Sequence, residues 1–213
     1  MKRRTFVLVI QVLLAGVVAG CGSSSVAAHP SPSPSPGLSA ADQALLAQLE
    51  QRPLHLPTPL KPGVCRPDEN DPKTGLWGKD PVYVVGGPHI STSFGDYFYV
   101  SAITRPGMAG PVLLRARDLI AANHPVVYVQ TADASNDIFF AGAVYGTDPT
   151  FGKQYTELVI DTSHIASATY QVGTTSYQES FWEQGIGRGW TGCVGFQIDS
   201  PGFSEDINVS VTP

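Results

Sequence analysis

The sequence lacks the motifs that would reveal an enzyme directly. It contains no GxSxG, HExxH, P-loop or GxGxxG motif, and none of its five histidines has a neighbour at metal-ligand spacing. The segment 133–137, DASND, resembles the start of a calcium loop but lacks that loop's glycine and final acid. We therefore expect no catalysis, no cofactor and no metal site, with a hydrolase of unrecognised site as an alternative.

The sequence also lacks an apolar run long enough to cross a membrane. Residues 6–19 are apolar apart from Gln11, whereas a membrane-spanning helix needs about 20 apolar residues. Lys2, Arg3 and Arg4 precede the run, and a positive start followed by a short apolar stretch is typical of a signal peptide. We expect residues 1–20 to be such a peptide.

Cysteine is scarce, with three in 213 residues, and the first has a distinctive position. Cys21 follows Val18, Ala19 and Gly20, where the apolar run ends and a serine run begins. This resembles the lipobox of bacterial lipoproteins, in which the cysteine thiol is alkylated with diacylglycerol. The resemblance implies a lipid anchor on Cys21 at the extracytoplasmic face of the cell membrane, because two acyl chains give stable attachment. The alternatives are a secreted protein with a chance cysteine and a membrane anchor formed by the N-terminal segment.

Basic residues are few once the signal peptide is set aside. The 13 basic residues fall to 10 against 18 acidic ones, a formal net charge of −8. This charge argues against nucleic acid as a partner and against adhesion to anionic lipid. Residues 22–37, GSSSVAAHPSPSPSPG, cannot form a core and favour an extended conformation. We expect residues 21–38 to tether a monomeric domain to the membrane, where it meets an envelope glycan or protein.

Residues 39–213 are predicted to form a single all-β domain, an Ig-like antiparallel β-sandwich. Ser39 and Asp42 are typical of a helix start, and leucines at helical spacing predict a helix over 40–51. Prolines from Pro53 onward predict an extended strap over 52–65. The remaining sequence has β patterns separated by Gly- and Pro-rich turns, which predict strands at 82–85, 97–104, 112–117, 126–131, 138–145, 156–161, 192–199 and 207–212.

Cys65 and Cys193 remain as a potential pair if Cys21 is acylated. An exported protein meets no thiol buffer, so a Cys65–Cys193 disulfide is the simplest interpretation, with a free reactive Cys193 as the alternative. Strand alternation puts Val194, Phe196 and Ile198 on one face, and Cys193, Gly195, Gln197 and Asp199 on the other. A disulfide on that outer face would fasten the strap across the sheet.

The segment 180–190, SFWEQGIGRGW, is the best binding candidate. We interpret it as a glycine-rich loop flanked by Trp182 and Trp190 and containing Glu183, Gln184 and Arg188. Aromatic rings beside polar groups are how β-sandwich modules bind sugars, so a carbohydrate-binding module is an alternative function. Equally, both tryptophans could serve as core or edge residues, because Trp is highly buried on average.

Several segments together resemble a known group of proteins. They are RPLHLP, then a Pro-Gly before Cys65, then DPVYVVG, GPVLLRARDL and GWTGCVGFQIDSPGFSEDINVSV. In this order they resemble lipoproteins and secreted proteins of actinobacteria and related soil bacteria, for which no activity is known to us. The resemblance implies an exported β-domain with a Cys65–Cys193 pairing. It implies no functional residue, so the expected function is that of a non-catalytic binding or interaction module.

Overall fold

The structure is a computed structural model that describes residues 37–56, 69–71, 75–91, 96–120, 126–129, 137–148, 152–165, 169–186 and 192–211. All of these belong to one unit, Pro32–Pro213. The predicted signal peptide and Cys21 lie outside the described residues, as does nearly all of the predicted tether.

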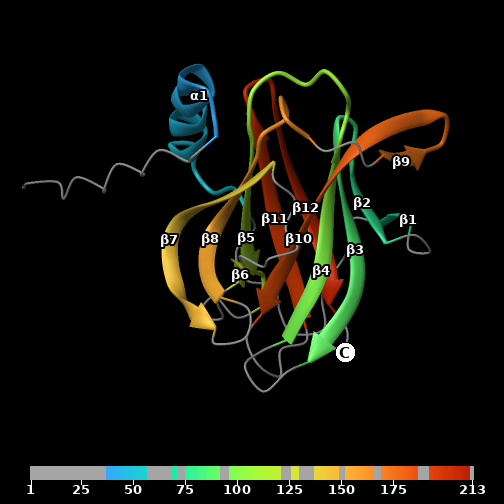
Figure 1. Ribbon diagram of the computed structural model, residues 1–213. Coiled ribbons are helices and arrows are strands. Elements are labelled where there is room, and N and C mark those ends of the chain that lie inside the picture. The colour runs from blue at the N-terminus through green and yellow to red at the C-terminus, as the bar shows by residue number, and fades with distance from the viewer. Residues whose placement is uncertain are drawn as a thin grey trace, which may run out of the picture. The chain divides into compact units, whose positions relative to one another are not determined.

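Antiparallel strands dominate this unit, with one helix before them (Figure 1). Hydrogen bonds connect ten strands in the order β1-β2-β3-β4-β10-β6-β8-β5-β11-β12, with β7 added to β8 and β9 to β10. The described elements are α1 (Ala40–Glu50), β1 (Glu69–Asp71), β2 (Leu76–Lys79), β3 (Val82–Ser91), β4 (Asp96–Thr104), β5 (Val112–Asp118), β6 (Val126–Val129), β7 (Ile138–Asp148), β8 (Gly152–Ile160), β9 (Thr169–Val172), β10 (Thr175–Ile186), β11 (Gly192–Ser200) and β12 (Phe203–Val211).

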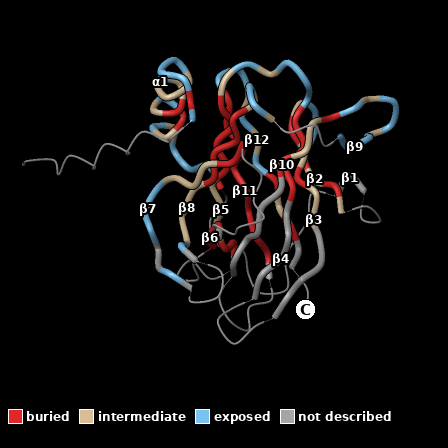
Figure 2. The backbone as a smooth tube through the Cα atoms, viewed as in Figure 1, coloured by how far each residue is buried: buried red, intermediate tan, exposed pale blue. Residues whose placement is uncertain are grey.

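The sheet folds back on itself around the main core, which confirms the predicted all-β, sandwich-like class. Apolar residues of β3 and β4 meet those of β5, β11 and β12 in one buried cluster. Val194, Phe196 and Ile198 all point into this cluster, as the strand alternation predicts. Where the two ends of the ladder approach each other, the backbone N–H of Lys79 on β2 donates to Glu205 on β12 at 3.3 Å. Buried residues accordingly line the interior (Figure 2).

Helix α1 forms as the sequence predicts and ends one residue earlier. Ser39 caps it, because its hydroxyl oxygen accepts the backbone N–H of Asp42 at 3.1 Å. Leu46 and Leu49 are its buried residues. They pack with Leu38 against Leu113 of β5 and Val159 of β8. The helix therefore lies on the outer face of the sheet, opposite the main core. It is neither long nor apolar enough to cross a membrane, and it is the only helix in the described part of the chain.

Both faces of β8 are buried near the end of the strand. Leu158 and Ile160 enter the main core, but Val159 is also fully buried, and Asp161 just beyond the strand is buried as well. The reason is α1, which covers the outer face at Val159. Alternation of polar and apolar residues therefore identified the strand but not the solvent exposure of its second face.

The opposite outer face carries its own cover, which the sequence did not predict. β9 and β10 form a hairpin, and Tyr170 and Val172 of β9 pack over Leu76, Ile103 and Tyr177. β1, β2, β9 and β10 were not among the predicted strands. β10 is the longest of the described strands and bridges β4 to β6, so the sequence analysis missed a central part of the ladder.

Candidate functional site

The predicted binding loop around Trp182 is in part a strand. Trp182 and Glu183 lie within β10, so the assignment of Glu183 and Gln184 to a loop is wrong. In the ladder, Trp182 pairs with Val100, and Glu183 pairs with Tyr99 on β4 and with Val129 on β6. These hydrogen bonds on both sides give the segment its extended backbone. Arg188 and Trp190 lie outside the described residues.

The pairing of β10 with β4 is regular on both sides of Trp182. Ser180, two residues earlier, is fully buried and pairs with Ala102, a member of the main core. The pairing continues without a shift to Ile186, so alternate positions keep their faces. The side chain of Trp182 lies outside the described part of the chain. The carbohydrate-binding function stays a prediction.

Cys193 lies on the outer face of β11, as the alternation predicts, but it is fully buried there. It packs against Leu56 of the strap and against Leu119. It does not titrate, because its sulfur belongs to a disulfide. Cys65 lies outside the described residues, so its pairing with Cys193 remains a prediction.

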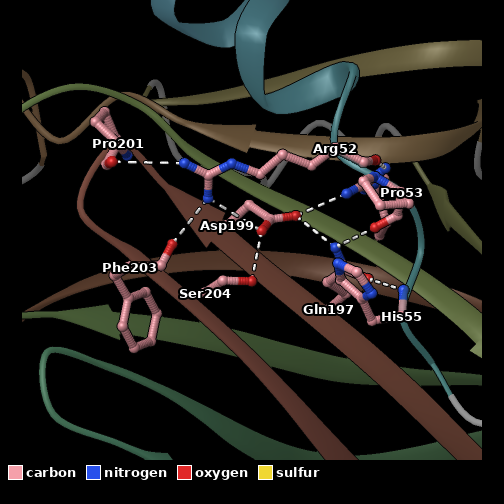
Figure 3. Close-up of polar contacts among 9 residues, drawn as sticks. Arg52, Pro53, His55, Gln197, Asp199, Pro201, Phe203 and Ser204 are labelled. Atoms are coloured by element: carbon pink, nitrogen blue, oxygen red, sulfur yellow. Dashed lines mark hydrogen bonds and ion pairs between the residues drawn. The ribbon is translucent and has the colours of Figure 1, made fainter.

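The start of the strap, residues 52–56, lies on this same outer face and is held by a buried carboxylate (Figure 3). Asp199 on β11 has no solvent exposure. Its Oδ1 accepts from Arg52 of the strap at 3.3 Å and from Ser204 at 2.7 Å, and its Oδ2 accepts from Arg115 of β5 at 2.7 Å. Charge-assisted bonds of this kind are about twice as strong as neutral ones, so Arg52 is fixed at the start of the strap.

The side chain of Gln197 holds the strap backbone. Its Oε1 accepts the backbone N–H of His55 at 2.6 Å, and its Nε2 donates to the carbonyl of Pro53 at 3.0 Å. Arg115 adds a third bond, from Nη1 to the carbonyl of Arg52 at 2.8 Å. An amide that donates and accepts at alternate residues recognises extended backbone, and it does so here without any strand ladder.

Leu56 ends the described strap in an apolar contact. Its side chain is buried against Leu119 and Cys193. Gly195 on β11 makes room for it, because a Cβ at that position would lie 3.0 Å from Leu56 Cδ2 and 2.9 Å from Leu119 Cδ2. We call the set that receives the strap the strap site: Arg115, Leu119, Cys193, Gly195, Gln197, Asp199 and the carbonyls of Pro201 and Phe203.

The pKa values of two carboxyl groups near the strap site are shifted in opposite directions. Burial alone would raise the pKa of Asp199, but the hydrogen bonds from Ser204, Arg115 and Gln197 outweigh burial and leave that pKa below its ordinary value. The pKa of Asp206, across from Gln197 on β12, is raised, mainly by burial. Asp199 therefore remains ionised, as its two arginine partners require.

A second pair of carboxyl groups lies where α1 meets the sheet. Burial raises the pKa of Glu157 on β8, against the opposing effect of Arg115. Burial, and then the charge of Glu157, raise the pKa of Glu50 at the end of α1. The two acids disfavour each other's ionisation, so this junction differs electrostatically from the neighbouring strap site.

Asp161, Ser163 and His164 meet in a turn after β8 but do not form a catalytic triad. His164 Nδ1 lies 2.6 Å from Asp161 Oδ2 and 2.9 Å from Ser163 Oγ. In a triad the serine and the acid contact opposite nitrogens of the ring, so that one nitrogen takes the serine proton while the acid orients the ring through the other. Here both contact the same nitrogen, and the serine hydroxyl also donates to Asp161 Oδ1 at 2.6 Å. The arrangement stabilises a turn.

Metal ligands do not gather in the described part of the chain, where no group of three His, Cys, Asp or Glu residues could hold an ion. Asp137, the last residue of the DASND segment, is buried and accepts a hydrogen bond from Ser180. The other four residues of that segment lie outside the described residues.

Comparisons with protein-family models, with curated proteins and with solved structures find no match. The strap site is therefore the best-supported candidate site on geometric grounds alone. The sequence analysis placed its β11 residues on the correct face but missed their role, because alternating polar residues in a strand usually face water. The buried acid Asp199 would have been the signal, since a carboxylate inside a strand next to a covered face needs cationic partners.

Proposed function

We propose that the protein is a non-catalytic, lipid-anchored cell-envelope protein that acts as a binding or interaction module. The observation that supports this proposal is the docking of the N-terminal segment on the sheet. The chain that leaves the predicted tether is fixed on the sheet at Leu49, Arg52 and Leu56 rather than joined to it loosely. A domain whose N-terminal segment is fixed in this way is suited to presenting a surface at a defined orientation to the membrane.

The sequence supports the membrane attachment. Cys21 ends a lipobox-like segment, and we propose that it carries the acyl anchor as in the actinobacterial lipoproteins that the chain resembles. The serine- and proline-rich tether would hold the acidic domain at a distance from the lipid. In the same location, outside the cytoplasm, we propose that Cys65 is the partner of Cys193.

Labelling with a palmitate analogue tests the anchor in a bacterium that processes lipoproteins. We expect the wild-type protein to carry the label and to partition into the detergent phase, and Cys21→Ala to do neither. The matched control is Cys65→Ala, which should keep the label. A wild-type protein found unlabelled in the aqueous phase would contradict the anchor.

Mass mapping without reduction tests the disulfide. The purified wild-type chain should give one peptide pair joined through Cys65 and Cys193, which separates on reduction. Recovery of Cys193 as a free thiol would overturn the pairing and leave the anchor untouched.

In-cell crosslinking followed by mass spectrometry tests the interaction function. We expect a fixed set of crosslinked partners.

A further inference from the structure

The strap is held on the sheet like a bound peptide rather than like a strand. Residues 53–56 have no ladder partner, and their backbone contacts are with the side chain of Gln197. The side chains of Pro53, Leu54 and His55 are exposed, whereas Leu56 is buried. Residues 52–56 could therefore leave the sheet without breaking any pairing between strands, while Cys65 keeps its proposed disulfide to Cys193.

The contacts define which features of a peptide the strap site recognises. At one end the guanidinium of Arg52 donates to Asp199 and also to the carbonyls of Phe203 at 3.2 Å and Pro201 at 3.5 Å. At the other end, four residues later, Leu56 fills the space above Gly195. Between these two anchors, the strap site contacts only the backbone of the strap. The combination is that of peptide recognition: a charged anchor, a backbone contact and an apolar anchor.

The strap site is organised by bonds that do not involve the strap. Arg115 donates to Asp199 Oδ2, Gln197 Nε2 donates to the same oxygen at 2.8 Å, and Ser204 donates to Oδ1. These four side chains belong to adjacent strands β5, β11 and β12. Because they hold one another in place, the site would keep its form when the strap is replaced by another chain, and preorganisation of this kind favours binding.

We propose that the strap site binds an extended segment of a partner envelope protein that carries an arginine and, four residues later, a leucine, and that the strap occupies the site as an internal competitor. The inference rests on the proposed function as an interaction module and names the chemistry of its partner. A cation is required because the recognising carboxylate is fully buried and the two carbonyls beside it can only accept. Arginine suits these three acceptors, because its Nη1 donates to Asp199 and Phe203 while its Nη2 donates to Pro201. The residues between the anchors are free, because their side chains face outward.

The strap sets the threshold for such a partner. A segment of the same chain competes at an effective concentration on the order of millimolar or above, so the site is closed to weak ligands. A partner gains access when the strap is weakened or when its own segment binds more tightly. This is autoinhibition by an internal copy of the ligand.

The test uses the mature chain with Cys21→Ser and a strap weakened at both anchors by Arg52→Ala and Leu56→Ala. The probe is a fluorescent peptide of residues 51–57, QRPLHLP, followed by anisotropy. We expect the probe to bind the double variant and to bind the wild-type strap chain at least tenfold more weakly. Probes with alanine in place of Arg52 or in place of Leu56 should each lose at least tenfold in affinity. A probe with alanine in place of His55 should bind with unchanged affinity.

Three results would overturn the proposal: no binding to the folded double variant, equal binding to the double variant and the wild-type strap, or equal binding of the arginine-less probe. Should the double variant lose its fold, the wild-type strap chain decides, because probe on the order of 10 mM must then displace the strap and shift the amide signals of Leu54, His55 and Leu56. Unmoved signals would overturn the proposal too. A failure here would leave the palmitate labelling and crosslinking results standing, so it is distinguishable from a failure of the proposed function.

Discussion

Helix α1 and the strap are consecutive in the chain and cover neighbouring strips of one sheet face, yet they are held by different forces. The helix lays Leu46 and Leu49 on apolar residues of β5 and β8. The strap places Arg52 on the buried carboxylate of Asp199 and its backbone on Gln197. Apolar contact is non-directional, whereas charge-assisted hydrogen bonds fix geometry as well as affinity. The strap therefore sets the register of the whole N-terminal segment, and the helix adds burial.

Removal of the carboxylate from the strap site should have the largest effect. Asp199→Ala leaves Arg115, whose side chain is 11% exposed, without its acid. Breaking a buried pair costs about 3–5 kcal/mol, and the partial exposure of the arginine places the loss at the lower end of this range. We expect a loss of this size in the free energy of unfolding, measured by urea denaturation. Asp206→Asn, on the neighbouring strand, is the control and should be neutral or slightly stabilising, because burial already disfavours its charge. Equal losses in the two variants would mean that the ion network has no special role.

Truncation of the helix contact should cost less. Leu49 is 1% exposed, and Leu49→Ala should lower the free energy of unfolding by about 2 kcal/mol, the lower end of the usual range for buried leucine. The lower end applies because α1 can detach without opening the main core. Leu54→Ala is the matched control, since Leu54 is 38% exposed. We expect less than about 0.5 kcal/mol there.

The backbone contact of the strap can be tested at a single residue. His55→Pro removes the N–H that Gln197 accepts and leaves a buried oxygen unpaired, which costs about 1–3 kcal/mol. His55→Ala keeps that N–H and should stay within about 0.5 kcal/mol of the wild type. Hydrogen exchange at Leu56 should rise in the proline variant alone. If the alanine variant is equally destabilised, the imidazole side chain and not the backbone holds the strap.

The smallest and most discriminating effect is the response to pH. Asp199 has a lowered pKa, so its contribution is present above the ordinary value of 3.8 and is lost as the pH falls through the lowered value. Glu50 and Glu157 have raised pKa values, so their contribution is complete below the ordinary value of 4.5 and is lost as the pH rises through the raised values. The strap should thus loosen in acid, while α1 should loosen towards neutral pH.

Hydrogen exchange, corrected for intrinsic rates, should resolve the two responses in peptides covering α1 and the strap. Arg115 interacts with both Asp199 and Glu157. Because arginine stays charged over this pH range, it adds no pH dependence of its own to either response. Glu157→Gln should flatten the response of α1 and leave that of the strap unchanged. A common direction for both segments would refute the distinction.

The sequence predicted the parts of this face that depend on local pattern. Ser39 and the leucine spacing identified α1, and alternation in β11 identified which residues share the face of Cys193. The prolines predict an extended strap over 52–65, of which the structure describes residues 52–56. Burial of that face was not predictable, because it depends on the helix and strap folding back across strands more than 100 residues away. β10 was missed for a related reason. Its glycine and polar residues read as a loop, but hydrogen bonds from β4, β6 and β9 impose an extended backbone.

The series arrangement of helix and strap has a mechanical consequence. Within the described residues, tension from the N-terminal side acts at Gly37, which lies against the ring of Phe139, and then at α1. The helix would peel away contact by contact at low force, whereas the bonds at Arg52, Pro53 and His55 resist together. The strap therefore resists the tension after α1 has detached and unfolded. A domain held this way can extend by the length of an unravelled helix before any load reaches its core.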